Sequence, residues 1–349
     1  MRPPMREPRF WQYPRAGRVS VLPSLLAPAA YLWGAAGRMR RRYAKPVRAA
    51  VPVICIGNLS AGGTGKTPLA LTLAERFIKS GEVVHFLTRG YGGREHGPLR
   101  VDPLRDTAAD VGDEPLLLAA VAPTWVSADR AEGAAAAARA GAALIIMDDG
   151  FQNPSLDKTI SLLVVDAHAG LGNGRLIPAG PLREREADAL ARTGAVVIIG
   201  HGHAADGLAA RARNRALPVF RAIARARPAP GLDGLPVLAF AGIGRPEKFY
   251  ATLRELHANI VATEDFPDHH MFSEADAQRL LVRARDLGAT LVTTEKDLVR
   301  LLHAPGGSAR ARLRDAVQTI SIRTLIDDFA AFETLIRDAI KAARRPARI

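Results

Sequence analysis

The stretch Gly57-Asn-Leu-Ser-Ala-Gly-Gly-Thr-Gly-Lys-Thr67 decides the fold of this 349-residue chain. It follows the apolar run Val51-Pro-Val-Ile-Cys-Ile56 and precedes the helical pattern Pro68-Leu-Ala-Leu-Thr-Leu-Ala-Glu-Arg-Phe77. A strand, a glycine-rich loop ending in Gly-Lys-Thr and a helix together are the context that a phosphate-binding loop requires. The glycines let backbone N–H groups surround phosphate oxygens, and the new helix points its positive end at the same anion. The stretch therefore predicts a P-loop enzyme that binds ATP.

Individual positions of the loop have expected roles. Lys66 is expected to reach the β- and γ-phosphates of ATP, and Thr67 to offer its hydroxyl to Mg²⁺. The general motif has glycine five residues before Gly65, where this chain has Ser60, so the loop is a variant of the motif. We expect eight consecutive residues to bind the nucleotide: Ser60, Ala61, Gly62, Gly63, Thr64, Gly65, Lys66 and Thr67.

A pair of acids forms the second chemical feature. The apolar run Ala143-Leu-Ile-Ile-Met147 ends in Asp148 and Asp149. Carboxylates at the end of a buried strand hold Mg²⁺ directly or through water. Acids at strand ends also serve as plain turn or helix caps, which is the alternative here. We expect Asp148 and Asp149 to be metal ligands together with Thr67, and Asp149 to be essential for turnover.

Around these motifs, apolar runs of strand length alternate with longer helical patterns, which indicates an α/β fold with a mainly parallel sheet. The expected strands are 52–57, 83–88, 123–127, 143–148, 160–166, 195–200, 236–241, 289–294 and 318–323. The stretch 201–235 has the composition of a linker. We expect a P-loop domain over 49–215 and a second, smaller α/β domain over 216–349 that closes a cleft.

The charge of the chain, +13, is concentrated at its ends. Residues 1–48 carry eleven Lys and Arg against one acid, and the last nine residues carry four more. The body is close to neutral, so an arm and a tail, rather than the fold, are expected to meet an anionic surface. The single cysteine, Cys55, lies in an apolar run and is expected to be buried and structural, as in a reducing compartment.

Within the arm, the stretch from Val19 to Gly37 has no charged residue and is bounded by arginines on both sides. Its prolines make one straight membrane span unfavourable. We expect an interfacial segment with Trp11, Tyr13, Tyr31 and Trp33 at the depth of lipid headgroups and arginines on phosphates. The alternative is an ordinary helix packed on the body.

Three classes of P-loop protein remain at this point: a GTPase, a DNA-acting ATPase and a kinase of a small molecule or lipid. A GTPase has an Asn-Lys-x-Asp motif, and the nearest match, Thr294-Glu-Lys-Asp297, has the wrong spacing. A DNA-acting ATPase carries basic residues among aromatics on its folded body, and this body is near neutral. A kinase is therefore favoured, and no nucleic acid is expected as a partner.

Eight motifs in one order resemble those of the tetraacyldisaccharide 4′-kinase family. They are the P-loop, Thr88-Arg-Gly-Tyr-Gly92, Val111-Gly-Asp-Glu-Pro115, Ser127-Ala-Asp-Arg130, Asp148-Asp-Gly-Phe-Gln152, Gly180-Pro-Leu-Arg-Glu184, Phe266-Pro-Asp-His-His270 and Thr294-Glu-Lys-Asp297. The resemblance implies transfer of the γ-phosphate of ATP, with Mg²⁺, to the 4′-hydroxyl of an acylated glucosamine disaccharide 1-phosphate in lipid A biosynthesis. It also implies a peripheral or monotopic protein on the anionic cytoplasmic face of the inner membrane, without an obligate protein partner.

The same resemblance implies residue roles. Asp113 is implied to receive the hydroxyl proton, working with His269, although Asp113 also suits the start of a helix. Arg183 and Glu184 are implied to lie near the nucleotide. The residues implied to contact the acceptor substrate are Tyr91, Arg130 and Gln152. A P-loop kinase of another phosphorylated small molecule is the alternative function.

Overall fold

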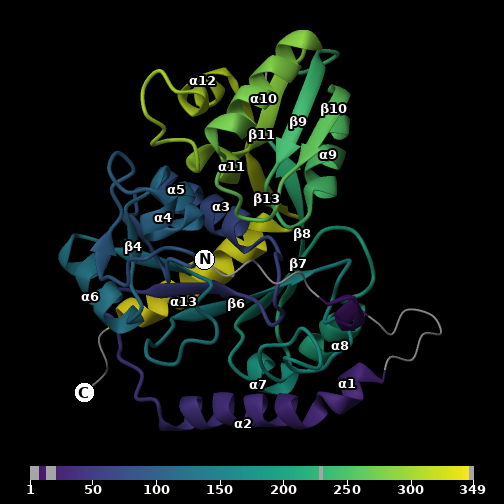
Figure 1. Ribbon diagram of the computed structural model, residues 1–349. Helices are drawn as coiled ribbons and strands as arrows, with labels where there is room; N and C mark the ends of the chain where they lie inside the picture. Colours follow the sequence, from purple (N-terminus) through teal and green to yellow (C-terminus); the bar gives the residue numbers. More distant parts are fainter. Residues whose placement is uncertain (1–7, 13–20, 228–230, 346–349) are drawn as a thin grey trace.

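The computed structural model describes residues 8–12, 21–227 and 231–345. Two sheets organise this part of the chain into a larger and a smaller lobe (Figure 1). The fold class is the expected one, with mainly parallel sheets between helices. Beneath the larger lobe, at the lower edge of Figure 1, lie the helices of the N-terminal arm.

The larger sheet has nine strands in the order β13-β8-β7-β6-β1-β5-β2-β4-β3. Only the outermost strands, β13 and β3, are antiparallel to their neighbours. The strands are β1 (Val53–Gly57), β2 (Val84–Thr88), β3 (Leu99–Arg100), β4 (Thr124–Val126), β5 (Leu144–Asp148), β6 (Ile160–Asp166), β7 (Ala195–Ile199), β8 (Val219–Ala226) and β13 (Ile322–Ile326). All five residues of each of β1, β2, β5 and β7 are buried, because helices cover both faces of the sheet.

Alternate residues of the central strand β1 pack against opposite layers of helices. Ile54 and Ile56 face α3 (Lys66–Lys79) and α13 (Phe329–Arg344), whereas Val53 and Cys55 face the other layer. The remaining helices of this lobe are α4 (Ala108–Val111), α5 (Asp113–Ala119), α6 (Arg130–Arg139), α7 (Glu186–Leu190) and α8 (Asp206–Arg213). Cys55 is fully buried, as expected, and burial raises the pKa of its thiol to about 12.

The smaller lobe contains a parallel sheet of four strands in the order β10-β9-β11-β12. Its elements are β9 (Pro236–Ala241), α9 (Pro246–Glu255), β10 (Asn259–Asp265), α10 (Glu274–Asp286), β11 (Thr290–Thr294), α11 (Glu295–Val299), α12 (Ala309–Ala316) and β12 (Gln318–Ile320). Leu238 and Phe240 pack in the cluster that α10 and α12 complete, and Val237 and Ala239 pack under α9.

The lobes do not follow the expected boundary at residue 216. The stretch 201–235 is not a linker, because it contains helix α8 and strand β8. Strand β13 and helix α13, near the C-terminus, return to the larger lobe, where β13 pairs with β8. The smaller lobe is thus an insertion between β8 and β13. Strand β8 of the larger sheet was missed because it carries two arginines and only one of its eight residues is buried, near the sheet edge.

The arm contains a short 3-10 turn (Arg9–Gln12) and two helices, α1 (Leu22–Leu25) and α2 (Ala27–Tyr43). The side of α2 that packs on the body carries small residues, Ala30 and Gly34. Trp11 differs from the expectation: it is partly buried, and its Nε1–H donates to the carbonyl of Pro178 at 3.0 Å. Tyr13 lies outside the described residues. No helix in the described ranges is long and apolar enough to span a membrane.

Candidate active site

The P-loop connects the carboxyl end of β1 to the first turn of α3. Gly62 and Gly65 have φ values of 105° and 86°, so the loop takes a path that side chains with a Cβ rarely adopt. Buried Asn58 stabilises the loop because its Nδ2 donates to the carbonyls of Ser60 at 2.8 Å and Gly62 at 3.3 Å. The amide of Ala61 donates to the carbonyl of Pro181 at 2.8 Å. The loop is therefore fixed from both sides around the position expected for phosphates.

The acid pair lies beside the P-loop because β1 and β5 are neighbours in register, with Ile56 opposite Asp148. The hydroxyl of Thr67 donates to Oδ2 of Asp148 at 3.0 Å, and both side chains are buried. Burial, and then the charge of Glu114, raise the pKa of Asp148 to about 7. Its other oxygen, Oδ1, is buried and has no hydrogen-bond partner. This orphaned oxygen beside the Thr67 hydroxyl fits an oxygen-coordinated cation.

Asp149 points in a different direction from Asp148, because its backbone adopts a left-handed conformation with φ 53°. Its carboxylate lies 3.5 Å from Lys66 Nζ and accepts from Arg183 Nη1 at 3.0 and 3.1 Å. Burial alone raises the pKa of Asp149, but Lys66 and Arg183 outweigh it and lower the pKa. Lys66 and Arg183 thus both lie on the carboxylate of Asp149.

Asp113 and His269 come from different lobes and meet. Asp113 is the first residue of α5, and its Oδ2 lies 3.0 Å from Nδ1 of His269, which belongs to the segment after β10. The side chain of Asp113 is 4% exposed, whereas that of His269 is 32% exposed. His269 has φ 59°, a strained conformation held by the bond from its amide to the Gly242 carbonyl.

The electrostatics of this pair depend on the hydrogen bond between its members. That bond raises the pKa of His269 against the opposing effect of burial. Burial by itself raises the pKa of Asp113, but His269, Lys296 and Arg300 outweigh it and hold the pKa far below its usual range. Asp113 is therefore favoured as a carboxylate, and His269 is the more exposed member of the pair.

Two basic side chains lie against the first turn of α5: Lys296 of α11 and Arg300, the residue directly after α11. Lys296 Nζ lies 2.6 Å from Glu114 Oε1. Arg300 is buried between two carboxylates: its Nη2 pairs with Asp113, and its Nη1 lies 2.7 Å from Asp297. Arg300 was not among the residues expected from the sequence. The available signal was its spacing of four residues from Lys296, which places both on one face of a helix.

The three residues expected to contact the acceptor substrate lie in different surroundings. Tyr91 is 74% exposed, and its ring centroid is 6.3 Å from that of His269. Arg130 is buried and donates to the carbonyls of Ser127 and Ala128, while its Nε has no partner. Burial, with the nearby charge of Arg89, lowers the pKa of Arg130 to about 10.

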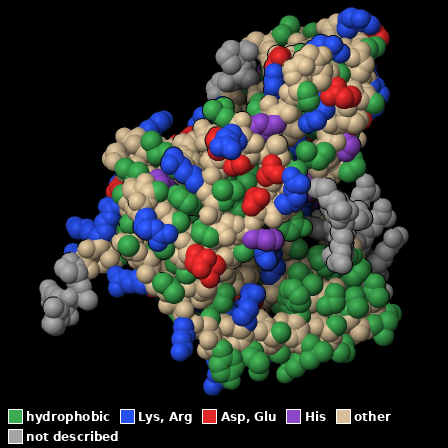
Figure 2. All heavy atoms as spheres, turned by 60° about the vertical axis from the view of Figure 1, so that its left-hand side comes forward, with side chains coloured by type: hydrophobic (Ala, Val, Ile, Leu, Met, Phe, Trp, Pro, Cys, Tyr) green, Lys and Arg blue, Asp and Glu red, His purple; other side chains and the backbone are tan. Residues whose placement is uncertain are grey.

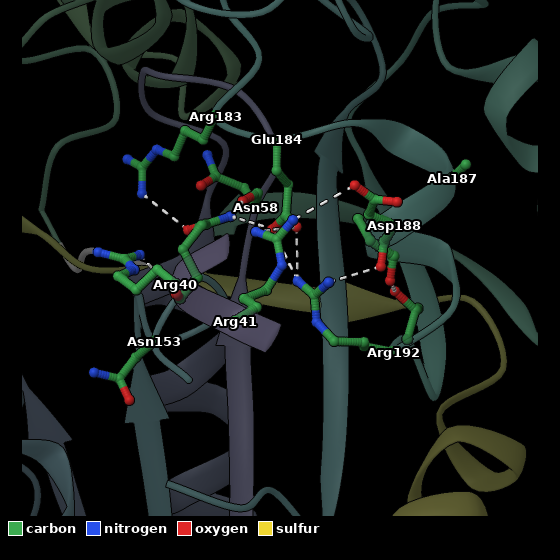
Figure 3. A network of polar contacts seen from close by, with 12 residues as sticks. Arg40, Arg41, Asn58, Asn153, Arg183, Glu184, Ala187, Asp188 and Arg192 are labelled. Carbon is green, nitrogen blue, oxygen red and sulfur yellow. Dashed lines mark hydrogen bonds and ion pairs between the residues drawn. The ribbon is translucent and has the colours of Figure 1, made fainter. Parts of the chain in front are cut away.

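Gln152 links the P-loop to Glu184. Its Nε2 donates to the Asn58 carbonyl at 2.7 Å and to Glu184 Oε1 at 3.2 Å. Glu184, expected near the nucleotide, is occupied by side chains of the protein. It is 2% exposed and forms ion pairs with Arg41 at 3.1 Å and Arg192 at 2.8 Å, as Figure 3 shows. A buried carboxylate needs such partners, and here arginines of α2 and of the residues after α7 supply them.

Comparisons with known proteins show the family of the chain. The family model for tetraacyldisaccharide-1-P 4′-kinase matches residues 22–341. The chain belongs to this family. A tetraacyldisaccharide 4′-kinase of Parvibaculum lavamentivorans is 65% identical over 98% of this chain and 100% of its own length. One from Rhodospirillum centenum is 55% identical over 88% of this chain and 91% of its own length.

A solved structure supports the fold of the family. The crystal structure of LpxK from Aquifex aeolicus in complex with ATP has a TM-score of 0.69 and 25% sequence identity, and the match covers 91% of this chain and 99% of that one. Membership in the tetraacyldisaccharide 4′-kinase family makes the chain a phosphotransferase, and the P-loop type of the larger lobe is confirmed.

Proposed function

We propose that the protein transfers the γ-phosphate of ATP to the 4′-hydroxyl of tetraacyldisaccharide 1-phosphate. The observation that carries this function is the pairing across the two lobes of His269 with Asp113, which belongs to the lobe that also holds the P-loop. A nucleotide-hydrolysing switch needs no side chain to take a proton from an alcohol, whereas a kinase needs one. Membership in the family supplies the acceptor class.

The P-loop residues position and neutralise the phosphates. Lys66 lies at the start of α3, where the N–H groups of the first turn have no partners within the helix. Its ammonium lies 3.5 Å from the carboxylate of Asp149 and stabilises the negative charge that develops on the transferred phosphoryl group. Arg183 on the opposite side of Asp149 keeps that carboxylate ionised.

His269 is the group that receives the hydroxyl proton, and Asp113 orients it. The family resemblance gave Asp113 the leading role, but its buried carboxylate is already engaged by Arg300 and the imidazole. The carboxylate on Nδ1 favours the tautomer in which Nε2, 3.8 Å from Asp268 Oδ2, accepts the proton, and it stabilises the imidazolium that results. Tyr91, exposed beside His269, is placed to contact the sugar.

Thr67 and Asp148 are the residues that would hold Mg²⁺. The unpartnered Oδ1 of Asp148 and the Thr67 hydroxyl are hard oxygen donors, which Mg²⁺ prefers. In the described part of the chain no cluster of three or more His, Cys, Asp and Glu is placed to hold a metal. Mg²⁺ at such sites usually completes its shell with phosphate oxygens and water. When bound, it neutralises charge on the phosphates.

The arm is proposed to place the enzyme on an anionic membrane surface. The outward side of α1 and α2 is apolar, with Leu25, Tyr31, Leu32 and Met39 each more than 60% exposed. Figure 2 shows hydrophobic side chains gathered along the lower edge of the molecule, with Lys and Arg at one end of the patch. A helix that packs on its own protein through small residues and turns bulky apolar ones outward is suited to lipid.

The reaction itself tests the proposal. The purified protein is incubated with γ-labelled ATP, Mg²⁺ and tetraacyldisaccharide 1-phosphate in detergent micelles, and the products are separated by thin-layer chromatography. Label is expected in the lipid, and Lys66→Ala is the matched negative control. Label that remains in ATP and free phosphate, without labelled lipid, contradicts this function and favours a kinase of another phosphorylated small molecule.

A further inference from the structure

Helix α2 does more than lie beneath the larger lobe, because one side of it contacts the active site. Trp33 Nε1 donates to the carbonyl of Arg183 at 3.0 Å. About two turns later, Arg40 Nη2 donates to the carbonyl of Gln152 at 3.1 Å, and Arg41 Nη1 lies 3.1 Å from Glu184. All three contacts end on residues that flank the metal carboxylates and the P-loop.

Glu184 is the centre of these contacts (Figure 3). Its Oε2 pairs with Arg41 and Arg192, and its Oε1 accepts from Arg192 at 3.0 Å and from Gln152 at 3.2 Å. The carboxylate is 2% exposed, and the side chain of Arg41 is only 16% exposed. Removal of one partner from such a buried pair leaves an uncompensated charge, which favours displacement of the segment that carries Glu184.

Arg183 carries the effect of this network to the chemistry. It is the neighbour of Glu184 in the chain, and its side chain points the other way, to Asp149. Its amide donates to the Leu59 carbonyl at 2.7 Å, directly before the P-loop variant at Ser60. Any shift of Glu184 therefore displaces Arg183 from Asp149 and loosens the start of the P-loop.

We propose that Arg41 and Trp33 are positioning residues for phosphoryl transfer, which act through Glu184 and Arg183 on Asp149 and make turnover depend on α2 being docked. The proposal rests on the kinase function above and adds a second role to the arm. The opposite side of α2 is the apolar surface. One helix therefore contacts the active site with one side and a bilayer with the other, and the bilayer holds α2 in its docked position.

Arg41→Ala tests the proposal in detergent micelles at saturating lipid and ATP, where no bilayer is needed for activity. The kcat is expected to fall about 10- to 100-fold, as is typical when a group that orients a metal or phosphate site is removed. The KM for lipid should change less than twofold. The matched control is Arg139→Ala, an exposed arginine in the last turn of α6, for which kcat should remain within twofold of wild type. Equal kcat values for the two variants would overturn the proposal.

Further variants separate positioning from simple instability. Arg41→Lys keeps the charge and should restore part of the lost kcat, whereas Arg41→Ala combined with Glu184→Gln should be no slower than Arg41→Ala alone, because one network is lost in both. Thermal unfolding of each variant shows whether it is folded at the assay temperature. A kcat loss that Arg41→Lys does not reduce, and that adds to the Glu184→Gln loss, refutes the coupling.

Hydrolysis of ATP without lipid provides a readout that does not depend on the acceptor. It requires Lys66 and Asp149 but neither the sugar nor the membrane. Arg41→Ala should lower this rate by a similar factor, and Arg139→Ala should not. If the wild-type protein phosphorylates no lipid, the proposed function fails, while the hydrolysis rates still decide whether Arg41 positions the site.

Discussion

Replacement of Arg300 by alanine should be among the most damaging single changes outside the P-loop. Arg300 is 1% exposed in its side chain and neutralises two carboxylates, Asp113 at 4% and Asp297 at 0% exposure. It also donates to the carbonyl of Gly242 at 2.7 Å. Arg300→Ala leaves both carboxylates buried with fewer partners, in a place where burial already raises the pKa of Asp297.

The size of the effect follows from this burial. Removal of one partner from a buried ion pair costs about 3–5 kcal/mol, whereas an exposed pair contributes about 0.2–1 kcal/mol. The matched control is Arg279→Ala in the same lobe, since Arg279 also contacts two acids, Glu264 and Asp276, but is 50% exposed. With an m-value of about 3 kcal/mol/M, Arg300→Ala should lower the urea midpoint by on the order of 1 M.

The assay is urea unfolding followed by circular dichroism, with kcat measured on each folded variant. Arg300→Lys should lie between wild type and Arg300→Ala, because an ammonium keeps the charge and cannot pair with both carboxylates in the same fixed geometry. If the unfolding free energies of Arg300→Ala and Arg279→Ala agree within about 0.5 kcal/mol, the buried network does not stabilise the lobe contact as argued.

Four further outcomes are expected. Lys66→Ala should lower kcat by several orders of magnitude, measured by label transfer to lipid, because it removes the cation aimed at the transferred phosphoryl group; near-normal activity excludes the P-loop assignment. Asp113→Asn should lower kcat and move the acidic limb of the kcat/KM profile to lower pH. The carboxylate raises the pKa of His269 above its ordinary value, and a general base acts in its neutral form. When the carboxylate is lost, the pKa of His269 falls and the acidic limb follows it to lower pH. An unshifted limb in a pH titration would remove His269 from the role of base. Asp148→Ala should raise the Mg²⁺ concentration needed for half-maximal rate more than Asp149→Ala does, and the reverse order in a Mg²⁺ titration contradicts the ligand assignment. Leu32→Glu should weaken co-sedimentation with anionic vesicles, whereas Leu104→Glu, at a still more exposed leucine outside the arm, should not; equal binding of both shows that α2 does not meet the bilayer.

Much of the site could be predicted from the chain because it is local. The P-loop, Lys66 and Thr67 are specified by a strand, a glycine-rich turn and a helix that follow each other directly. Asp148 was expected beside them because the carboxyl ends of parallel strands share one edge of a sheet. The buried strands β1, β5, β6 and β7 were found for a similar reason: continuous apolar runs of strand length report burial on both faces.

Elements and contacts that depend on distant partners were not predictable in this way. Strands β8 and β13 near the edge of the sheet carry polar residues. They pair with each other in the larger lobe, and the smaller lobe is inserted in the chain between them. Asp113 and His269 are 156 positions apart, and Asp113 and Arg300 are 187 apart. The family resemblance indicated the first pair. The spacing of Arg300 from Lys296 indicates a shared helix face, but no local pattern identifies Asp113 as its partner.

The sequence by itself determined the nucleotide-binding chemistry and an arm that is both basic and apolar. The tertiary structure alone decided that Glu184 pairs with Arg41, and that Arg300 pairs with Asp113. The physical reason is that backbone periodicity and turn geometry are written into neighbouring residues, whereas the partner of a buried charge is chosen by how layers and lobes pack. A buried carboxylate must be paired, but only the packed fold determines which arginine reaches it.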